Sequence, residues 1–342
     1  MNALSRFRSP WFATCIACTL LALIGLNGCA TRGAKLDKDT NAGRGIAYAQ
    51  ASAPFAAMSA FAYQQVRKDA TDVASLEKLK GYLVANGWEA YRTPDTDQPI
   101  TPTPAADAVG LYYDVWVNKT YSPRVVVIAF RGTEFTTWQD WKSNFWWVTR
   151  ALDPDSTQYS RAAAANELGR VFNALKNDLN TVIITTGHSL GGGLAQCLRY
   201  SFPSQVVQCY AFNTTPVTAF YGQPETQRKE FEEMLPIAAF PSHRTLRIYE
   251  KGEILAYLRA QMRMLNPVDE KIIEVRWNFD EIRTNPIGNH GMMEFAEKIV
   301  EVSQKPGLRP GYEPWWRKPG SPPPGARPEE EPSSIKQLRQ VE

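Results

Sequence analysis

Residues 181–193, TVIITTGHSLGGG, decide the fold of this chain. An apolar run leads into Gly-x-Ser-x-Gly, and the residues from Leu190 onward favour a helix. This order predicts a buried strand, a tight turn that carries Ser189, and a helix that begins directly after it. Gly187 and Gly191 lie where a side chain would collide with the neighbouring strand and helix. The stretch therefore predicts a nucleophile elbow, with the serine hydroxyl at a helix N-terminus that favours developing negative charge.

Apolar strands alternate with helices on both sides of this stretch. Expected strands are 110–117, 124–130, 181–186, 206–212, 245–249 and 271–279, and expected helices are 46–68, 158–179, one from 190 and one after 290. The first two strands are separated by turn residues, which predicts a hairpin. The pattern as a whole predicts an α/β fold, with a mostly parallel sheet covered by helices on both faces.

Composition excludes several classes of protein. The 342 residues carry 38 Lys and Arg against 35 Asp and Glu, a formal charge of +3. This near-neutrality argues against nucleic-acid binding by bulk charge. A hydrophobic fraction of 44% with 11% aromatic residues provides for a sizeable core and excludes global disorder. We expect one hydrolase domain over residues 46–304 and a Pro-rich, largely disordered tail over 305–342.

The first residues have the features of a secretory signal. Basic residues precede an apolar run at 11–26, which is shorter than a bilayer-spanning helix requires. A retained membrane anchor is the alternative. The run ends in Leu-Asn-Gly-Cys, which resembles the lipobox of bacterial lipoproteins. The resemblance implies a signal peptide over 1–28, lipidation of Cys29 and a tether over 29–45 that holds the protein on a membrane. Ala30 after the cysteine favours the outer membrane of the bacterial cell envelope.

Cysteine usage agrees with this interpretation. Cys15 and Cys18 leave with the signal peptide, and Cys29 carries the lipid. Cys197 and Cys209 then remain, either as a disulfide in an oxidising compartment or as two buried thiols. The one CxxC spacing, Cys15 and Cys18, lies in the predicted signal peptide, and no CxxC or His/Cys cluster indicates a metal site, so we expect no metal and no cofactor.

A serine nucleophile requires a base, and the chain has three histidines. His188 lies beside the serine in the turn, points the wrong way, and is expected to pack beneath it. His243 is expected on an exposed loop. His290 lies late in the chain, on a loop that leads into a helix, which fits the order Ser, acid, His. We therefore predict His290 as the base of Ser189.

The acid of the triad should follow the strand at 245–249 and precede His290. Glu253 is the first choice, Glu250 the second and Asp280 a distant third. The role of this acid is to hold the imidazole tautomer and to stabilise the imidazolium. A solvated surface glutamate is the alternative explanation of Glu253.

At this point the residues resemble the class 3 (fungal-type) lipases, a family of α/β-hydrolases. The segments that carry the resemblance are FRGT at 130–133 followed by Asp140, Trp141 and Asn144, GHSLGG at 187–192, and RIYEKGEILAYL at 247–258. The resemblance covers roughly residues 110–300. Two positions depart from the family pattern: Glu253 replaces the usual Asp, and Asn-Thr-Thr-Pro at 213–216 replaces Gly-Ser-Pro.

The resemblance implies further roles. The backbone N–H groups of Thr133 and Leu190 would form the oxyanion hole. Arg131 would be structural, pairing with an acid such as Asp140. The tryptophan-rich run at 138–147 would form either a lid or acyl-binding wall, or ordinary helix packing.

Together these features predict a lipid-anchored serine carboxylic-ester hydrolase, of lipase or phospholipase type, that acts on lipid or other esters through an acyl-enzyme. Two alternatives are open. An envelope lipoprotein could use the same fold for binding, and an acyltransferase or thioesterase would share the triad.

Overall fold

The structure is a computed structural model of the chain. The residues that it describes are 34–35, 42–65, 69–93, 97–104, 111–121, 124–132, 169–172, 175, 181–216, 218, 220, 223–234, 244–253, 255, 259, 272–277, 279 and 291–305. The chain divides into two compact units, Met1–Arg32 and Gly33–Glu342, and all described residues belong to the second.

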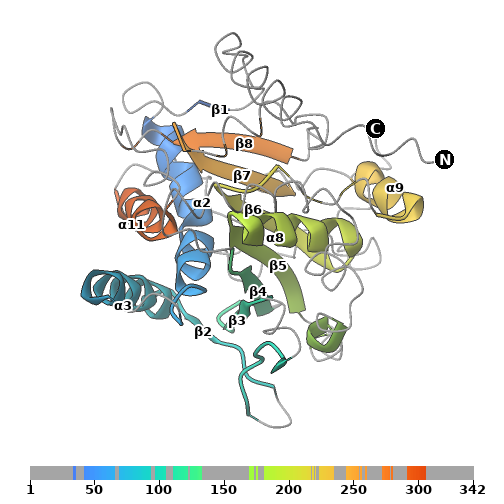
Figure 1. The fold of residues 1–342 in the computed structure, drawn as a ribbon, viewed down its shortest axis with the longest axis horizontal. Helices are drawn as coiled ribbons and strands as arrows, with labels where there is room; N and C mark the ends of the chain where they lie inside the picture. The colour runs from blue at the N-terminus through green and yellow to red at the C-terminus, as the bar shows by residue number, and fades with distance from the viewer. Residues whose placement is uncertain are drawn as a thin grey trace, which may run out of the picture. The chain divides into compact units, whose positions relative to one another are not determined.

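The described strands form one eight-stranded sheet (Figure 1). They are β1 Ala34–Lys35, β2 Trp88–Ala90, β3 Tyr113–Asn118, β4 Arg124–Phe130, β5 Thr181–His188, β6 Val206–Phe212, β7 Thr245–Glu250 and β8 Ile272–Trp277. Their order across the sheet is β1-β8-β7-β6-β5-β4-β3-β2. The pairs β2–β3 and β3–β4 are antiparallel, and every pair from β4 to β8, together with β1–β8, is parallel.

Helices cover both faces of the sheet. They are α2 Ala42–Phe61, α3 Ala70–Ala85, α8 Leu190–Ser201, α9 Glu225–Glu233 and α11 Met292–Ser303. The strands β4 to β8 lie across the sheet in the same order as in the chain. Right-handed crossovers between such parallel strands all lie on the same face of the sheet. The helix α8 and the helical residues 169–172 pack on that face. The opposite face is covered by α2, α3 and α11, which come from outside the run of parallel strands (Figure 1).

The two apolar layers follow from alternation along the central strands. In β4, Val125, Val127 and Ala129 belong to the core under α2, whereas Val126 and Ile128 belong to the core under α8. Because successive side chains of a strand point to opposite faces, a strand of consecutive apolar residues contributes side chains to both cores. This is the reason that the central strands consist almost entirely of apolar residues.

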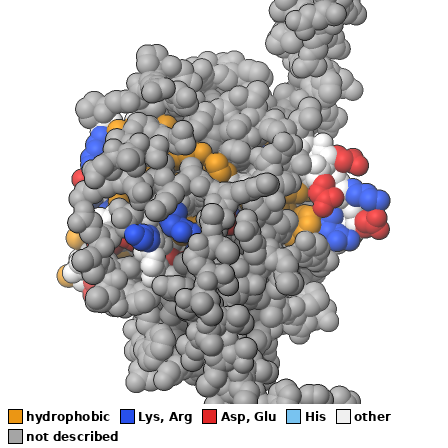
Figure 2. Space-filling view, turned by 90° about the horizontal axis from the view of Figure 1, so that it is seen from above, with side chains coloured by type: hydrophobic (Ala, Val, Ile, Leu, Met, Phe, Trp, Pro, Cys, Tyr) orange, Lys and Arg blue, Asp and Glu red, His pale blue; other side chains and the backbone are white. Residues whose placement is uncertain are grey.

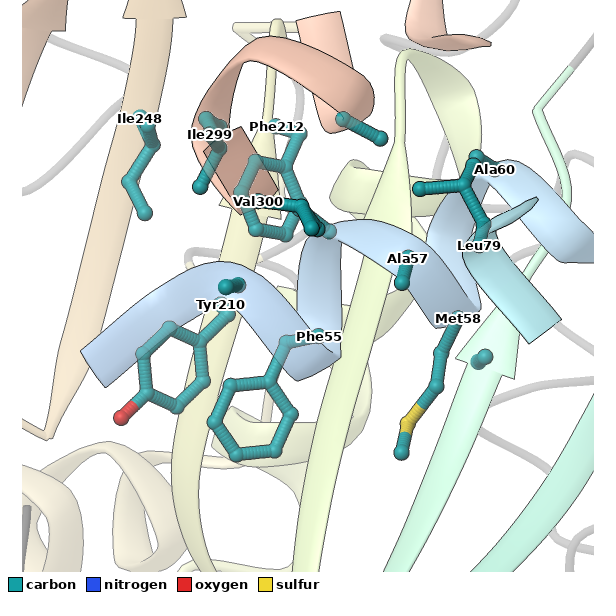
Figure 3. Packing of buried hydrophobic residues seen from close by; sticks show 14 of the residues in the cluster. Phe55, Ala57, Met58, Ala60, Leu79, Tyr210, Phe212, Ile248, Ile299 and Val300 are labelled. Atoms are coloured by element: carbon teal, nitrogen blue, oxygen red, sulfur yellow. The ribbon is translucent and has the colours of Figure 1, made fainter. Parts of the chain in front are cut away.

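Helix α2 is fixed to the middle of the sheet. The Phe55 ring stacks on Tyr210 of β6 with centroids 4.0 Å apart (Figure 3). The Ser59 hydroxyl lies 2.9 Å from the Thr186 hydroxyl of β5, and both are buried. These contacts place the C-terminal end of α2, and the turn after it, beside the end of β5.

Helix α9 covers less of the core. Phe231 is its buried residue, packed with Tyr200 of α8 and Phe220. Its other side chains carry both signs of charge, which Figure 2 shows intermixed at the end of the molecule where α9 lies. One pair, Lys229 and Glu225, is 2.8 Å apart.

The structure confirms the predicted α/β architecture and most of its elements. The hairpin is present as β3 and β4, and the strand at 206–212 has the predicted bounds. The helix expected at 46–68 is α2, which begins earlier and ends at Phe61, where the chain turns back toward the sheet. The strand expected at 181–186 continues to His188, so it runs directly into the turn. The sequence analysis did not predict β2, α3 or α9.

Several expectations concern residues outside the described ranges: the signal peptide over 1–28, Cys29, most of the helix at 158–179, and the tail from 306 onward. Within the segment expected to be a tether, Ala34–Lys35 pairs with β8, and α2 begins at Ala42. Among the helices that the structure describes, none is long and apolar enough to cross a membrane.

Candidate active site

The site lies at the carboxyl ends of β4, β5 and β6. The register pairs Phe130 with Gly187 and His188 with Phe212, so the three strands end at the same level. The residues that follow them therefore meet at one edge of the sheet, where ligand sites of open α/β sheets form. Ser189 lies at the centre of this edge.

Ser189 occupies a strained turn. Its backbone has φ 56° and ψ −122°, a conformation that non-glycine residues rarely adopt. Such a residue costs about 1–3 kcal/mol, and surrounding contacts must hold it in place. The Ser189 N–H donates to Phe212 O at 3.0 Å, and its carbonyl accepts from Gly192 N and Thr215 N, each at 3.1 Å. The serine is thus fixed to β6 on one side and to α8 on the other.

Glycines make this turn possible, as the sequence predicted. A Cβ atom on Gly187 would lie 2.3 Å from the carbonyl oxygen of Gly191. A Cβ atom on Gly191 would lie 2.3 Å from the carbonyl oxygen of Phe130. Neither backbone can move away without breaking the sheet or the start of α8. The two glycines therefore allow β4, β5 and α8 to meet behind the serine.

The serine hydroxyl is buried at the start of α8. Ser189 is fully buried, and its Oγ has no hydrogen-bond partner among the described residues. Leu190 is the first residue of α8, so its N–H has no acceptor within the helix. A buried hydroxyl beside open helix N–H groups has the environment that stabilises an oxyanion.

The segment after β4 packs directly on the serine. A Cβ atom on Gly132 would lie 3.0 Å from the Ser189 Cβ and 2.4 Å from the carbonyl oxygen of His188. The FRGT segment is therefore brought to the nucleophile turn by its glycine. Thr133, the expected second oxyanion donor, lies outside the described residues, as does the run at 138–147.

Of the three histidines, the structure describes His188. It is buried, and its Nδ1 lies 2.9 Å from the hydroxyl of Tyr63. This agrees with its expected packing beneath the turn. His243 and the predicted base His290 lie outside the described residues.

Glu253 is fully buried, which excludes a solvated surface carboxylate. Its Oε1 forms an ion pair with buried Arg259, and its Oε2 accepts from the Leu255 N–H at 2.8 Å. Arg259 also donates to the carbonyl of Thr214 at 2.6 Å and lies over the Tyr249 ring at 4.0 Å. The next residue, Thr215, donates its N–H to the Ser189 carbonyl. Glu253 is therefore linked to the serine turn through Arg259 and the Thr214–Thr215 segment.

Glu250, the second choice for the acid, is also buried at the end of β7. Its N–H donates to the side-chain oxygen of Asn213 at 2.9 Å. Asp280, the third choice, lies outside the described residues. Both leading choices are therefore buried, Glu250 as the last residue of β7 and Glu253 three residues after it.

Asn213 begins the Asn-Thr-Thr-Pro stretch that replaces the Gly-Ser-Pro of the lipase pattern. It has φ 39°, a left-handed conformation for which glycine is the usual residue. Asn is among the few side chains that tolerate this conformation. Its side chain accepts the Glu250 N–H, which a glycine could not do. Asn213 therefore forms the bend after β6 and links it to β7.

A buried polar network supports the start of α8. Gln196 of α8 donates to the Thr214 hydroxyl at 3.0 Å and accepts from Arg247 of β7 at 2.8 Å. Arg247 also lies 3.8 Å from Glu274 of β8. Sequence analysis missed this network and Arg259, because no short motif joins residues that meet only through the sheet order.

The structure decides between the two states of the remaining cysteines. Cys197 and Cys209 are both free and buried, so the possible disulfide is not formed. Each thiol has its own polar neighbours, Ser201 and Gln223 for Cys197 and Thr185 for Cys209. Burial raises the pKa of each thiol to about 12, which keeps both protonated and unreactive.

Arg131 of the FRGT segment acts electrostatically on an acid of the neighbouring strand β3. Its guanidinium lies 4.5 Å from the ring centre of Tyr112, and its charge acts on Asp114 of β3. Asp140 lies outside the described residues. The Oδ2 of Asp114 is buried without a hydrogen-bond partner among the described residues. Burial raises the pKa of Asp114 from 3.8 to about 7, although Arg131 opposes the rise.

Replacing Gly191 by Ala should disrupt the site, because the new Cβ would overlap the Phe130 carbonyl. We expect a loss of about 3 kcal/mol or more in the free energy of unfolding, measured by urea denaturation. Gly81 is the matched control, since it is in α3 and a Cβ there meets nothing within 4 Å. Gly81→Ala should stabilise by roughly 0.5–1 kcal/mol. Equal effects of the two changes would contradict the packing described for the turn.

Replacing Asp114 by Asn should change the pH dependence of stability. Between pH 3.8 and about 7 the native carboxyl keeps its proton while the unfolded one loses it, so wild-type stability falls as pH rises through this window. The Asn variant lacks this effect. Its unfolding free energy should gain about 3–4 kcal/mol on the wild type between pH 4 and pH 7.5, by urea denaturation. Parallel pH profiles would contradict the buried position of Asp114.

Comparison with known proteins gives a partial match. Residues 56–215 match the Phospholipase-like family, described as a Tle-like phospholipase domain. A stretch of 69 residues is 41% identical to the extracellular phospholipase A1 of Serratia liquefaciens and covers 20% of this chain and 18% of that protein. The chain thus matches less than two thirds of the length of this relative.

Among solved structures, the chain is similar to lipase II from Rhizopus niveus, with 13% identity and a TM-score of 0.32 over 63% of this chain and 76% of that one. It is also similar to a mutant form of MDLA from Penicillium cyclopium, with 15% identity and a TM-score of 0.36 over 74% and 86% of the two chains. The mostly parallel sheet, the helices on both faces and the strand–serine–helix turn are those of an α/β-hydrolase fold. Together with the match over residues 56–215, they support a lipase-like hydrolase.

Proposed function

We propose that this chain is a serine carboxylic-ester hydrolase of lipase or phospholipase type. The observation that carries the proposal is the Ser189 turn. Its backbone is strained, its hydroxyl is buried at the start of α8, and the FRGT glycine packs against its Cβ. A protein that needed only a tight turn here would fold with less strain if glycine replaced the serine. The serine therefore points to chemistry at its hydroxyl.

In the proposed mechanism, Ser189 Oγ attacks the acyl carbonyl carbon and His290 accepts the hydroxyl proton. The carbonyl π electrons move to the oxygen, which the N–H groups of Thr133 and Leu190 stabilise. The tetrahedral intermediate collapses, the C–O bond to the alcohol breaks, and His290 returns the proton to the leaving oxygen. Water then attacks the acyl-enzyme by the same route and releases the carboxylic acid.

Glu253 is the proposed acid that orients His290. Its burial and its position three residues after β7 support this role. The ion pair with Arg259 compensates the negative charge, which would otherwise be costly in the interior. The Leu255 N–H fixes the second carboxylate oxygen, so the carboxylate plane is held in one orientation. Glu250 is the alternative acid.

The proposed substrates are phospholipids or other lipid esters. The Tle-like phospholipase match and the identity to a phospholipase A1 support this class. We further propose that lipid on Cys29 holds the enzyme in the bacterial cell envelope, on the outer membrane, close to such substrates. The basis is the Leu-Asn-Gly-Cys sequence that ends the apolar run.

Replacing Ser189 by Ala tests the proposed function. We expect hydrolysis of p-nitrophenyl butyrate and of phosphatidylcholine vesicles to fall at least about 10⁴-fold, because the nucleophile is lost. Ser201→Ala is the matched control, since Ser201 is a buried serine at the far end of α8. It should retain activity within about threefold. Hydrolysis that survives Ser189→Ala would contradict the proposed mechanism.

The same assays assign the acid. Glu253→Gln should lower kcat by about 10³–10⁴-fold, because the amide no longer stabilises the imidazolium. Glu250→Gln should lower it by less than about tenfold. The reverse ranking would transfer the role to Glu250, and equal small effects would exclude both. Circular dichroism of each variant separates loss of the acid from loss of the fold.

A further inference from the structure

The phenol of Tyr63 joins two parts of the site that are far apart in sequence. Tyr63 lies in the turn that follows α2, and it is buried. Its hydroxyl lies 2.9 Å from His188 Nδ1 and accepts from the Gly132 N–H at 3.0 Å. Its ring meets the His188 ring edge to face, with centroids 5.7 Å apart. One hydroxyl group thus contacts the residue before the nucleophile and the glycine of the FRGT segment.

The donors and acceptors in these two hydrogen bonds of the Tyr63 hydroxyl can be assigned. The Gly132 N–H is a donor, so the Tyr63 oxygen is the acceptor of that bond. The Tyr63 hydroxyl donates to His188 Nδ1 when the imidazole is neutral with its proton on Nε2, because Nδ1 is then an acceptor. In this arrangement His188 orients the hydroxyl, and the hydroxyl orients the Gly132 peptide.

The Gly132 peptide has little freedom in this position. A Cβ atom there would lie 2.7 Å from the Tyr63 hydroxyl and 3.0 Å from the Ser189 Cβ. The peptide that leaves Gly132 leads to Thr133, whose N–H is a proposed oxyanion donor. The position of Gly132 therefore sets where the chain enters the residue that carries this proposed donor.

We propose that Tyr63 is a positioning residue for the oxyanion hole. Its hydroxyl holds the Gly132 N–H beside the Ser189 turn, and so fixes the point from which the chain continues to Thr133, the proposed oxyanion donor. This inference rests on the proposed function and deepens it. It also assigns a role to α2, whose contacts with Tyr210 and Thr186 fix the turn that carries Tyr63.

Tyr63→Phe tests the inference, because it keeps the ring and removes only the hydroxyl. A mispositioned oxyanion donor weakens transition-state binding more than substrate binding, so kcat should fall about tenfold with KM unchanged within twofold. Tyr91→Phe is the matched control. Tyr91 is buried, and its hydroxyl has no hydrogen-bond partner among the residues that the structure describes. It should leave kcat and KM unchanged.

Variants of His188 test the second half of the contact. His188→Asn keeps an acceptor near the Nδ1 position and should retain most of the wild-type kcat. His188→Phe removes the acceptor and should lower kcat about threefold or more. The double variant Tyr63→Phe/His188→Phe should be no slower than Tyr63→Phe alone, because both changes break the same link. Strictly multiplicative losses in kcat would overturn the proposed link.

The outcomes separate this inference from the proposed function. If Ser189→Ala abolishes activity and Tyr63→Phe has wild-type kcat, the positioning role of Tyr63 is wrong and the hydrolase mechanism stands. If Ser189→Ala keeps activity, the mechanism itself is wrong. Should Tyr63→Phe lower the thermal midpoint by more than 10 °C, the comparison of His188→Asn with His188→Phe decides, and equal kcat values there overturn the inference.

Discussion

The backbone of Ser189 is the constraint on which the site depends. Its φ of 56° can be held only because β4, β5 and α8 approach one another more closely than side chains would allow. Gly187 and Gly191 meet backbone atoms at distances that a Cβ would make impossible. The sheet register supplies the framework, since it brings the ends of three parallel strands to one level. The packing of both apolar layers offsets the conformational free-energy cost of this strained residue.

Two sets of buried polar contacts flank this turn and fix its surroundings. On the side of α2, the Tyr63 hydroxyl holds Gly132 and His188. On the side of β7, Thr214 joins Gln196 of α8 to Arg259, and Arg259 pairs with Glu253. Buried polar groups are costly unless they are satisfied, so such contacts favour one arrangement over its alternatives. The serine turn is thus restrained from both neighbouring strands.

Local pattern was sufficient for the central strands and for the turn. Runs of β-branched residues and the Gly-x-Ser-x-Gly spacing depend on neighbours a few residues away, and the elements at 124–130 and 206–212 match their predicted bounds. Helix α9 escaped prediction because Phe231 is its one buried residue. In α3 the buried residues Leu76, Leu79 and Leu83 form a narrow stripe among charged ones. Such short apolar stripes give a weak signal.

The supporting residues of the site could not be predicted from local pattern. Tyr63 is 69 residues from Gly132 and 125 from His188. Its role therefore depends on where α2 packs on the sheet. Asn213 stood out in the sequence only as part of the Asn-Thr-Thr-Pro stretch that replaces Gly-Ser-Pro, whereas its positive φ and its bond to Glu250 depend on the packing of β6 beside β7. Whether Cys197 and Cys209 form a disulfide likewise depends on how close α8 and β6 bring the two thiols, and both are free in the folded chain.

The central claim is that the hydroxyl at position 189 is an activated nucleophile. Reaction of the whole protein with a fluorophosphonate, followed by intact mass measurement and peptide mapping, tests it most directly. The account predicts one adduct per chain, on the peptide that contains Ser189, and none after prior heat denaturation. An unmodified protein, or an adduct on any other residue, would contradict it.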